Sequence, residues 1–297
     1  MNMELRTLRI FVEVVRQGGF SQAARTVFLT QSAVSKAVKQ LEDELGVLLL
    51  DRIGHRSSLT AAGDIVYRRA LQMLAEQSDL ISELAELRGL RRGRLRLGLP
   101  PIGSDALFAP LFAVYRKRYP GIEIQLAEHG SKRLEELVRS GEVDLGVSLL
   151  PVPDEFEWQD VRNEPMDVLL PLDHPLASAG EIELAMLKDM PFILFDTGFA
   201  LNPMILDACR LAGFTPAIAA RSSQITFIVE LVASGLGIGF LPRFIAEKRV
   251  HGRVRHVAVT RPSMAWHMAW IWRRGSYMSD AARTWLELAA ARSGPDA

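Results

Sequence analysis

The chain has 297 residues, 48% of them hydrophobic and 24% charged, a composition that is typical of a folded globular protein and excludes a disordered or fibrous one. Formal net charge is zero, with 14 basic and 11 acidic residues in 1–94 against 21 and 24 in the remainder, which allows a basic N-terminal module without establishing one. The single cysteine, Cys209, excludes a disulfide framework, and the six histidines show no paired ligand spacing, so we expect neither a metal nor a cofactor.

The first third of the chain is predicted to be helical, because all 15 prolines lie beyond residue 99. A first apolar stripe at helical spacing ends at Gly18. Ser21 is a candidate N-cap for a short helix, "QAARTVF", and Thr30 is a candidate N-cap for the helix that follows. Two short helices with a tight break between them predict a helix-turn-helix over about residues 20–39.

The second of these helices, in "LTQSAVSKAVKQLEDELG", carries an apolar stripe and, opposite it, a stripe of short polar residues followed by lysines. In a helix-turn-helix the second helix offers its outer face to the major groove of DNA. Gln31 can make paired hydrogen bonds to a base edge, and Ser32 and Ser35 can reach a base or a phosphate. Lys36 and Lys39 suit phosphate contacts. The spacing alone also fits an ordinary amphipathic helix.

The residues that follow favour DNA binding. "LDRIGHRSSLTAAGD" resembles a winged helix with Arg52, His55 and Arg56 on the wing. The run "GGFSQAARTVFLTQSAVSKAVKQLEDELGVLLLDR…LTAAG" resembles the N-terminal domain of LysR-type transcriptional regulators, although Ser32 stands where many members have Pro and Leu50 where many have Phe. The resemblance implies that double-stranded promoter DNA is the partner and RNA polymerase a further one. The candidate DNA-binding residues are Ser21, Gln31, Ser32, Ser35, Lys36, Lys39, Arg52, His55 and Arg56.

A long helix is predicted next, with Thr60 as its cap and Asp64 in its first turn. Apolar residues alternate along it at spacings of 4 and 3, which is a heptad seam with one polar interruption, Gln77, that could fix register. A helix packed only on its own domain is the alternative. The family resemblance implies that this helix pairs two chains, in a homodimer or homotetramer. The candidate dimerisation residues are Val66, Met73, Gln77, Leu80, Leu84 and Leu87.

From Arg94 onward, predicted strands alternate with helices, which indicates α/β structure with parallel strands. The expected elements include one helix over 104–120, strands at "MDVLLP" and "PFILFD", and helices over 202–211 and 225–233. "VASGLGIGFLP" and "SGEVDLGV" resemble the regulatory domain of the same family, which implies two lobes similar to periplasmic binding proteins.

The predicted fold class is therefore α+β and multidomain. A winged helix-turn-helix occupies residues 1–60, a linker helix 61–92 and an effector-binding domain 93–297. Within that domain the resemblance implies a lobe I of 93–163 and 265–297 and a lobe II of 164–264.

Such a two-lobed domain binds its ligand at strand ends and helix starts, where free N–H groups suit an anion such as a carboxylate. Ser104, Ser148, Ser222 and Ser223 stand at such places, although each could be only a helix cap. The loop "DTGFALNP" adds Gly198, which allows a ligand to approach the backbone closely, and Phe199, which could close the pocket. The candidate effector-binding residues are Pro101, Ser104, Ser148, Gly198, Phe199, Ser222 and Ser223.

"GFALNPMILDACRLAGF" and "RSSQITFIVELVASGLGIGFLP" resemble the branch of LysR-type regulators that controls murein-hydrolase (holin-like) operons and acetate-responsive genes, which implies a small weak acid as effector. The rival classes are an enzyme and an exported solute-binding protein. The chain has no GxSxG motif to support the first, and neither a signal-peptide core nor an apolar run of membrane-span length to support the second. We therefore expect a regulator without enzyme activity, in the cytoplasm and without a membrane partner.

Overall fold

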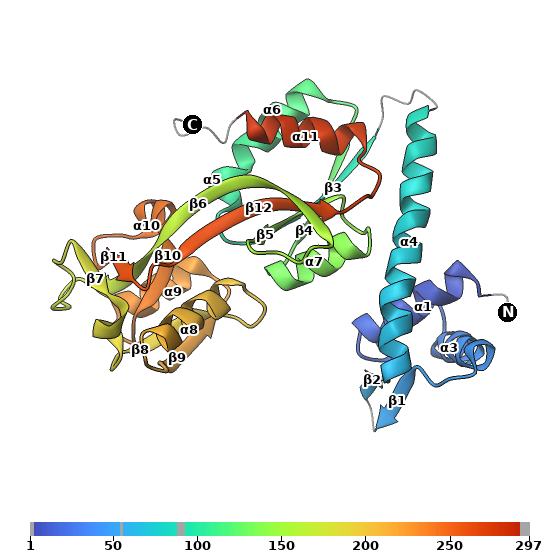
Figure 1. Cartoon of the computed structure of the whole chain (residues 1–297), viewed down its shortest axis with the longest axis horizontal. Helices are drawn as coiled ribbons and strands as arrows, with labels where there is room; N and C mark the ends of the chain where they lie inside the picture. The colour runs from blue at the N-terminus through green and yellow to red at the C-terminus, as the bar shows by residue number, and fades with distance from the viewer. Residues whose placement is uncertain (1–2, 54–55, 88–92, 292–297) are drawn as a thin grey trace. The chain divides into compact units, whose positions relative to one another are not determined.

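The computed structural model describes residues 3–53, 56–87 and 93–291, and the side chains of 52–53, 56–57, 82 and 85–87 are outside that description. The chain divides into two compact units, Met1–Leu90 with Arg139–Glu142, and Arg91–Val138 with Val143–Ala297. Helices, a two-stranded sheet and the long helix α4 form the first unit, and a large sheet with helices on it forms the second (Figure 1). The predicted fold class is confirmed.

Three helices and a hairpin make up the body of the N-terminal unit. They are α1 (Leu5–Arg16), α2 (Phe20–Thr26), α3 (Gln31–Leu45), β1 (Leu50–Ile53) and β2 (Arg56–Leu59). Thr30 caps α3 as predicted, because its hydroxyl accepts a hydrogen bond from the Ala33 N–H at 3.2 Å. Gly46 ends α3 in the left-handed region, at φ 69°, which a residue without Cβ adopts freely. β1 and β2 pair antiparallel, so the predicted wing is present.

The prediction that Ser21 caps α2 was wrong. That helix begins at Phe20, and Gly19 occupies the N-cap position without a side-chain hydrogen bond. Ser21 instead lies within the first turn of α2, where its side chain is exposed. The apolar residue Phe20 packs against the core of the unit, and this contact draws the start of the helix towards the N-terminus.

The long helix α4 (Ala61–Leu87) begins where expected. Thr60 accepts a hydrogen bond from the Gly63 N–H at 2.9 Å and donates one to the Leu48 carbonyl at 2.7 Å. Gly63 tolerates no side chain, because a Cβ there would lie 1.9 Å from the Leu49 carbonyl oxygen. The buried Glu42 supports the same loop by accepting a hydrogen bond from the Leu49 N–H at 2.8 Å. These contacts join α3, the wing and α4.

A mixed sheet organises the second unit. Among the described residues its strand order is β4-β3-β5-β12-β6-β11-β7, and β10 also pairs with β6. Its strands are β3 (Arg94–Leu99), β4 (Glu123–Glu128), β5 (Leu145–Leu149), β6 (Phe156–Pro171), β7 (Glu181–Glu183), β10 (Gly239–Pro242), β11 (Val254–Arg261) and β12 (Ala265–Arg273). β3 pairs parallel with β4 and β5, as the alternation of strands and helices predicts. A separate parallel pair consists of β8 (Pro191–Phe195) and β9 (Ala217–Ser222).

The long strand β6 belongs to both halves of this unit. Its residues up to Pro165 pair with β12, and from Met166 onward it pairs with β10 and β11 (Figure 1). The boundary of 163/164 that the resemblance implies therefore falls inside a continuous strand, just before the change of partner. We keep the terms lobe I for the β3–β5 and β12 side and lobe II for the β7–β11 side. The sequence predicted only the second part of β6 as a strand.

Helices cover both faces of the sheet in lobe I. α5 (Ser104–Leu107), α6 (Ala109–Arg118) and α11 (Asp280–Ala290) lie on one face, and α7 (Ser131–Arg139) lies on the other (Figure 1). The single helix predicted over 104–120 is two helices, broken at Phe108. Pro110 causes this break, because its ring cannot continue a helix from the preceding turn but fits the first turn of α6.

Lobe II contains α8 (Leu201–Leu211), α9 (Ile225–Ala233), α10 (Arg243–Arg249) and the 3-10 turn η1 (Leu184–Leu187). α8 and α9 match the helices predicted from sequence almost residue for residue. β7, α10 and β11 were not among the predicted elements. Buried side chains from both lobes form one hydrophobic cluster that includes Val168, Phe240 and Trp270, so the core is continuous where β6 passes from one lobe to the other.

Candidate functional site

The outer face of α3 presents the side chains that the sequence singled out. Gln31, Ser32, Lys36 and Lys39 are exposed and Ser35 is half-buried, while Val34 and Val38 are fully buried on the opposite side. The Ser32 hydroxyl lies 3.0 Å from that of Thr30, which places it at the first turn of the helix. The polar side chains therefore lie near the N-terminus of α3 and the positive charges lie further along it.

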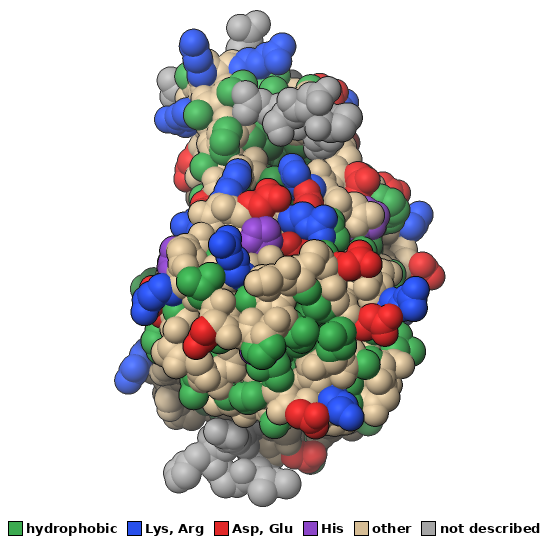
Figure 2. All heavy atoms as spheres, turned by 90° about the vertical axis from the view of Figure 1, so that its left-hand side faces the viewer, with side chains coloured by type: hydrophobic (Ala, Val, Ile, Leu, Met, Phe, Trp, Pro, Cys, Tyr) green, Lys and Arg blue, Asp and Glu red, His purple; other side chains and the backbone are tan. Residues whose placement is uncertain are grey.

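Charge elsewhere does not suggest a second DNA-binding surface on the face that Figure 2 shows. Acidic and basic side chains are interspersed over that face, and the described side chains form no broad basic region on it. On the wing, Arg52 and Arg56 pair across the two strands with Ser57 and Ile53, but their side chains are not described. His55 lies outside the described residues.

The predicted seam on α4 divides into two parts. Val66 packs partly against the unit's own core, and Gln77 accepts a hydrogen bond from Arg9 of α1 at 3.3 Å. Met73, Leu80 and Leu84 are exposed, as are two isoleucines that the prediction did not include, Ile65 and Ile81. The Leu87 side chain is not described. The second half of α4 thus has apolar side chains without a partner within the described chain.

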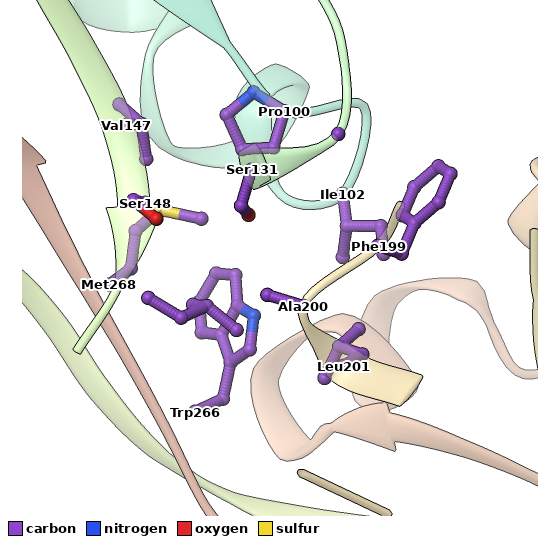
Figure 3. Close-up of a pocket in the computed structure, with 12 residues that line it drawn as sticks. Pro100, Ile102, Ser131, Val147, Ser148, Phe199, Ala200, Leu201, Trp266 and Met268 are labelled. Carbon is purple, nitrogen blue, oxygen red and sulfur yellow. The ribbon is translucent and has the colours of Figure 1, made fainter. Parts of the chain in front are cut away.

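A pocket that is open to solvent lies between the strand ends of lobe I and the loop that begins α8 in lobe II. Its cavity volume is about 20 Å³, so a ligand larger than a water molecule would extend from it towards the solvent. Apolar side chains and two serine hydroxyls face its interior (Figure 3). The lining residues are Pro100, Ile102, Gly130, Ser131, Val147, Ser148, Leu149, Phe199, Ala200, Leu201, Trp266 and Met268.

Ser131 is the polar group best placed to bind a ligand here. It is the first residue of α7, is only 7% exposed, and points its hydroxyl into the pocket (Figure 3). The described residues provide no hydrogen-bond partner for that hydroxyl. At the start of α7 the N–H groups of Arg133 and Leu134 donate to the Gly130 carbonyl, which leaves those of Ser131 and Lys132 to favour negative charge at this point.

Ser148 contributes a second hydroxyl from β5, on the other side of the pocket. It is 1% exposed and donates a hydrogen bond to Glu135 Oε1 at 2.7 Å. Glu135 lies one helical turn after Ser131, so α7 positions both polar groups.

The loops of the two lobes come close beside the pocket. A Cβ on Gly130 of lobe I would lie 2.6 Å from the Gly198 carbonyl oxygen of lobe II, so this contact requires glycine. Gly198 itself has φ 97°, a conformation that favours glycine. Phe199 follows it, lines the pocket and stacks on Phe195 with ring centroids 5.4 Å apart. A ligand in the pocket would therefore contact both lobes.

Of the predicted effector residues, Ser148 and Phe199 line the pocket and the others do not. The Ser104 hydroxyl donates to the Pro100 carbonyl, and Pro101 lies in an exposed turn. Ser222 accepts a hydrogen bond from the Gln224 N–H at 3.0 Å, and Ser223 is exposed. The bonds of Ser104 and Ser222 both stabilise the local turn.

Sequence reasoning missed Ser131, Trp266 and Met268. "EHGSKRLEE" carried the same signal as the chosen serines, because a strand ends there and a helix starts at Ser131. Trp266 and Met268 gave no such signal, since they belong to an apolar strand that pairs with distant segments.

Other chemical groups of the chain are placed in ways that do not suggest catalysis. The Cys209 side chain is fully buried, and this burial raises the pKa of its thiol to about 11, so the reactive thiolate is rare at neutral pH. The described residues contain no cluster of metal-ligating side chains. No helix in the described part of the chain is long and apolar enough to cross a membrane.

Comparison with known proteins agrees with this arrangement. Residues 5–64 match the family described as "Bacterial regulatory helix-turn-helix protein, lysR family", and residues 88–294 match the "LysR substrate binding domain". The HTH-type transcriptional regulator YwbI of Bacillus subtilis is 37% identical over 96% of this chain and 95% of its own length. The transcriptional dual regulator GltC of the same organism is 33% identical over 81% of each chain.

Solved structures show the same architecture over the whole length. A full-length OxyR variant from Pseudomonas aeruginosa is 28% identical, has a TM-score of 0.66, and covers 98% of this chain and 97% of its own. HinK from the same organism is 25% identical with a TM-score of 0.61 and full coverage of both chains. The chain belongs to the LysR family of DNA-binding transcriptional regulators, and not to a family of enzymes.

Proposed function

We propose that this regulator binds promoter DNA through α3 and the β1–β2 wing, and that a small anionic effector in the pocket of the second unit modulates that binding. The observation that carries the second part is Ser131, a residue that is 7% exposed and whose hydroxyl is directed into the pocket without a hydrogen bond to the described residues. This hydroxyl can donate a hydrogen bond to a ligand oxygen.

Small carboxylates are the ligands that this site fits best. The start of α7 offers N–H groups and a partial positive charge, and the Ser131 hydroxyl can complete the hydrogen bonds of an anionic oxygen. The family branch for murein-hydrolase operons stays a prediction, because neither YwbI nor GltC is described in those terms. Because promoter DNA is the proposed partner, the proposed site of action is the cytoplasm.

We further propose that α4 pairs two chains. Met73, Leu80 and Leu84 recur at heptad spacing and are exposed, so a second copy of α4 could bury them. A dimer would present two copies of α3 to two DNA half-sites. Gln77 is already bonded to Arg9, so it fixes register only if that weak contact gives way.

The experiment that tests the effector part is a footprint of the full-length protein on the DNA beside its own gene, titrated with a panel of small acids. We expect one class of acid to change the protected segment or the protein concentration that protects it. Ser131→Ala should weaken the response to that acid about tenfold, the cost of one hydrogen bond to a charged group. Ser234→Ala, an exposed serine of lobe II, is the matched control.

A response that is the same in Ser131→Ala and in the wild type would remove this pocket from the mechanism. Binding of DNA without acid should be unchanged in both variants, because neither serine lies in the N-terminal unit.

A further inference from the structure

The two serines in the pocket differ in what they offer a ligand, because Ser131 can donate a hydrogen bond and Ser148 can accept one. An ionised carboxylate only accepts hydrogen bonds, so the 2.7 Å contact between Ser148 and Glu135 uses the Ser148 proton. The Ser148 oxygen keeps lone pairs, and Ser148 lines the pocket (Figure 3). Ser148 is therefore an acceptor towards a ligand.

Ser131, in contrast, can donate a hydrogen bond to a ligand. The described residues contain no acceptor for its hydroxyl, and the N–H groups at the start of α7 lie beside it. This side of the pocket therefore donates hydrogen bonds. A ligand that satisfies both sides must carry an anionic acceptor group and a separate donor group within the span of one small pocket.

The remaining lining limits the charge of the ligand. The other side chains that line the pocket are apolar, among them Ile102, Trp266 and Met268, and no charged residue lines it in the described part of the chain. A second ligand charge would lose its hydration here without a cation to compensate for it. Glu135 behind Ser148 would add repulsion to any second carboxylate.

We propose that the effector is a small hydroxy monocarboxylic acid with an apolar skeleton. Its carboxylate is bound by Ser131 and the first turn of α7, and its hydroxyl donates to Ser148. This inference rests on the proposed effector site and names the class of ligand for it. A simple carboxylic acid would give the Ser148 oxygen no hydrogen bond to accept. A keto acid would place its keto oxygen, an acceptor, against the Ser148 oxygen, which is also an acceptor. An amino acid would leave two N–H groups of its ammonium facing apolar side chains.

The test is isothermal titration of the full-length protein with acids that share one skeleton. The probes are 2-hydroxy-3-methylbutanoate, 3-methylbutanoate, 3-methyl-2-oxobutanoate and valine, with lactate, propanoate and pyruvate as a shorter series. We expect the hydroxy acid to bind about tenfold more tightly than the other members of its series, which is the value of one well-formed hydrogen bond in a buried site. The dicarboxylate malate should bind more weakly than lactate.

Two variants separate this inference from its alternatives. Ser148→Ala should lower the affinity for the hydroxy acid to that for the simple acid, and should leave the affinity for the simple acid unchanged. Glu135→Ala frees the Ser148 proton, so that Ser148 can donate into the pocket. In this variant the keto acid should gain affinity relative to the hydroxy acid. Ser234→Ala should change neither.

The outcomes distinguish failure of the ligand class from failure of the site. If the simple or the keto acid binds the wild type as tightly as the hydroxy acid, the hydroxy-acid inference is wrong. Loss of that binding in Ser131→Ala would then still support the effector site. If no acid of either series binds at millimolar concentration, the pocket is not an anion site and both proposals fall.

Discussion

At the scale of single residues, Phe28 is the only non-glycine residue with a positive φ among the described residues. It lies in the turn between α2 and α3 with φ 54°, in the left-handed region that L-residues with a Cβ avoid. Its ring is 94% exposed, so packing does not offset the strain. The turn between the two helices needs this backbone conformation, and the side chain contributes nothing to it within the chain.

We therefore predict that Phe28→Asn stabilises the N-terminal unit by about 1 kcal/mol, because asparagine tolerates the left-handed region. Slower amide hydrogen exchange in α2 and α3 would show it. Phe28→Ala keeps a Cβ and removes only the exposed ring, so its exchange rates should match those of the wild type. Faster exchange in Phe28→Ala would mean that the ring stabilises the turn after all.

Cys209 gives a prediction for alkaline pH. Burial raises the pKa of its thiol from about 9 to about 11, so the folded protein holds this proton more tightly than the unfolded chain. The stability that the thiol contributes is complete below about pH 9 and is lost as pH rises through about 11. Urea unfolding should show a steeper loss in the wild type than in Cys209→Ala over this range. Parallel losses in the two proteins would contradict a buried, raised thiol.

At the scale of secondary-structure elements, we expect α3 to provide specificity and affinity through different side chains. Gln31 and Ser35 lie near its start, where we expect base contacts, and Lys39 lies about two turns further along, where we expect a phosphate contact.

We predict that Gln31→Ala relaxes sequence preference and costs about 1–3 kcal/mol at one base position, while Lys39→Ala weakens binding to all sequences and lowers the salt dependence. Selection of binding sites from random DNA, followed by titration at two salt concentrations, measures both. An unchanged preference in Gln31→Ala would show that this residue reads no base.

The helix α4 carries the prediction about assembly. Leu84 is exposed and lies beyond the part of α4 that packs on α1, so a charge at this position cannot disturb the fold of the unit. Leu84→Glu should nevertheless weaken the proposed dimer, because two glutamates would meet where the two copies of α4 pair. Sedimentation velocity at several concentrations is the measurement, with the exposed Glu83→Gln as control. An unchanged oligomer in Leu84→Glu would mean that α4 does not pair chains.

The elements also show which parts of the fold are determined by residues close together in the sequence. Thr30, Thr60 and Gly46 mark helix ends through contacts within a few residues, so those boundaries could be predicted. α9 was also predicted to the residue, although no side chain caps its start. The first part of β6 could not be predicted, because its pattern is set by pairing with β12, about a hundred residues away.

The pocket illustrates the same limit at the level of side chains. Local sequence suggested serines at strand ends, and it could not rank them, because all have the same local pattern. In the structure Ser104 and Ser222 bond to their own turns, whereas the Ser131 hydroxyl has no hydrogen bond to the described residues and lines the pocket. The decisive difference is the apolar lining from Trp266 and Met268, which only the fold brings to the site.

At the scale of the whole molecule, the proposed regulation requires a site in each unit to influence the other. The pocket takes side chains from both lobes, and β6 runs through both without interruption. A ligand that contacts both lobes can favour one lobe arrangement over another, and only such a difference in affinity can change DNA binding. The coupling must be reciprocal, because both effects come from one free energy.

The measurement that tests this claim most directly is a linkage cycle on the full-length protein. It compares the Kd for the protected promoter segment with and without saturating acid, using the acid that the pocket binds most tightly, and the Kd for that acid with and without the promoter segment. We predict that both constants change by the same factor, at least about fivefold, and that Ser131→Ala needs about tenfold more acid for the same change. Equal affinity for the promoter segment with and without bound acid would contradict the account.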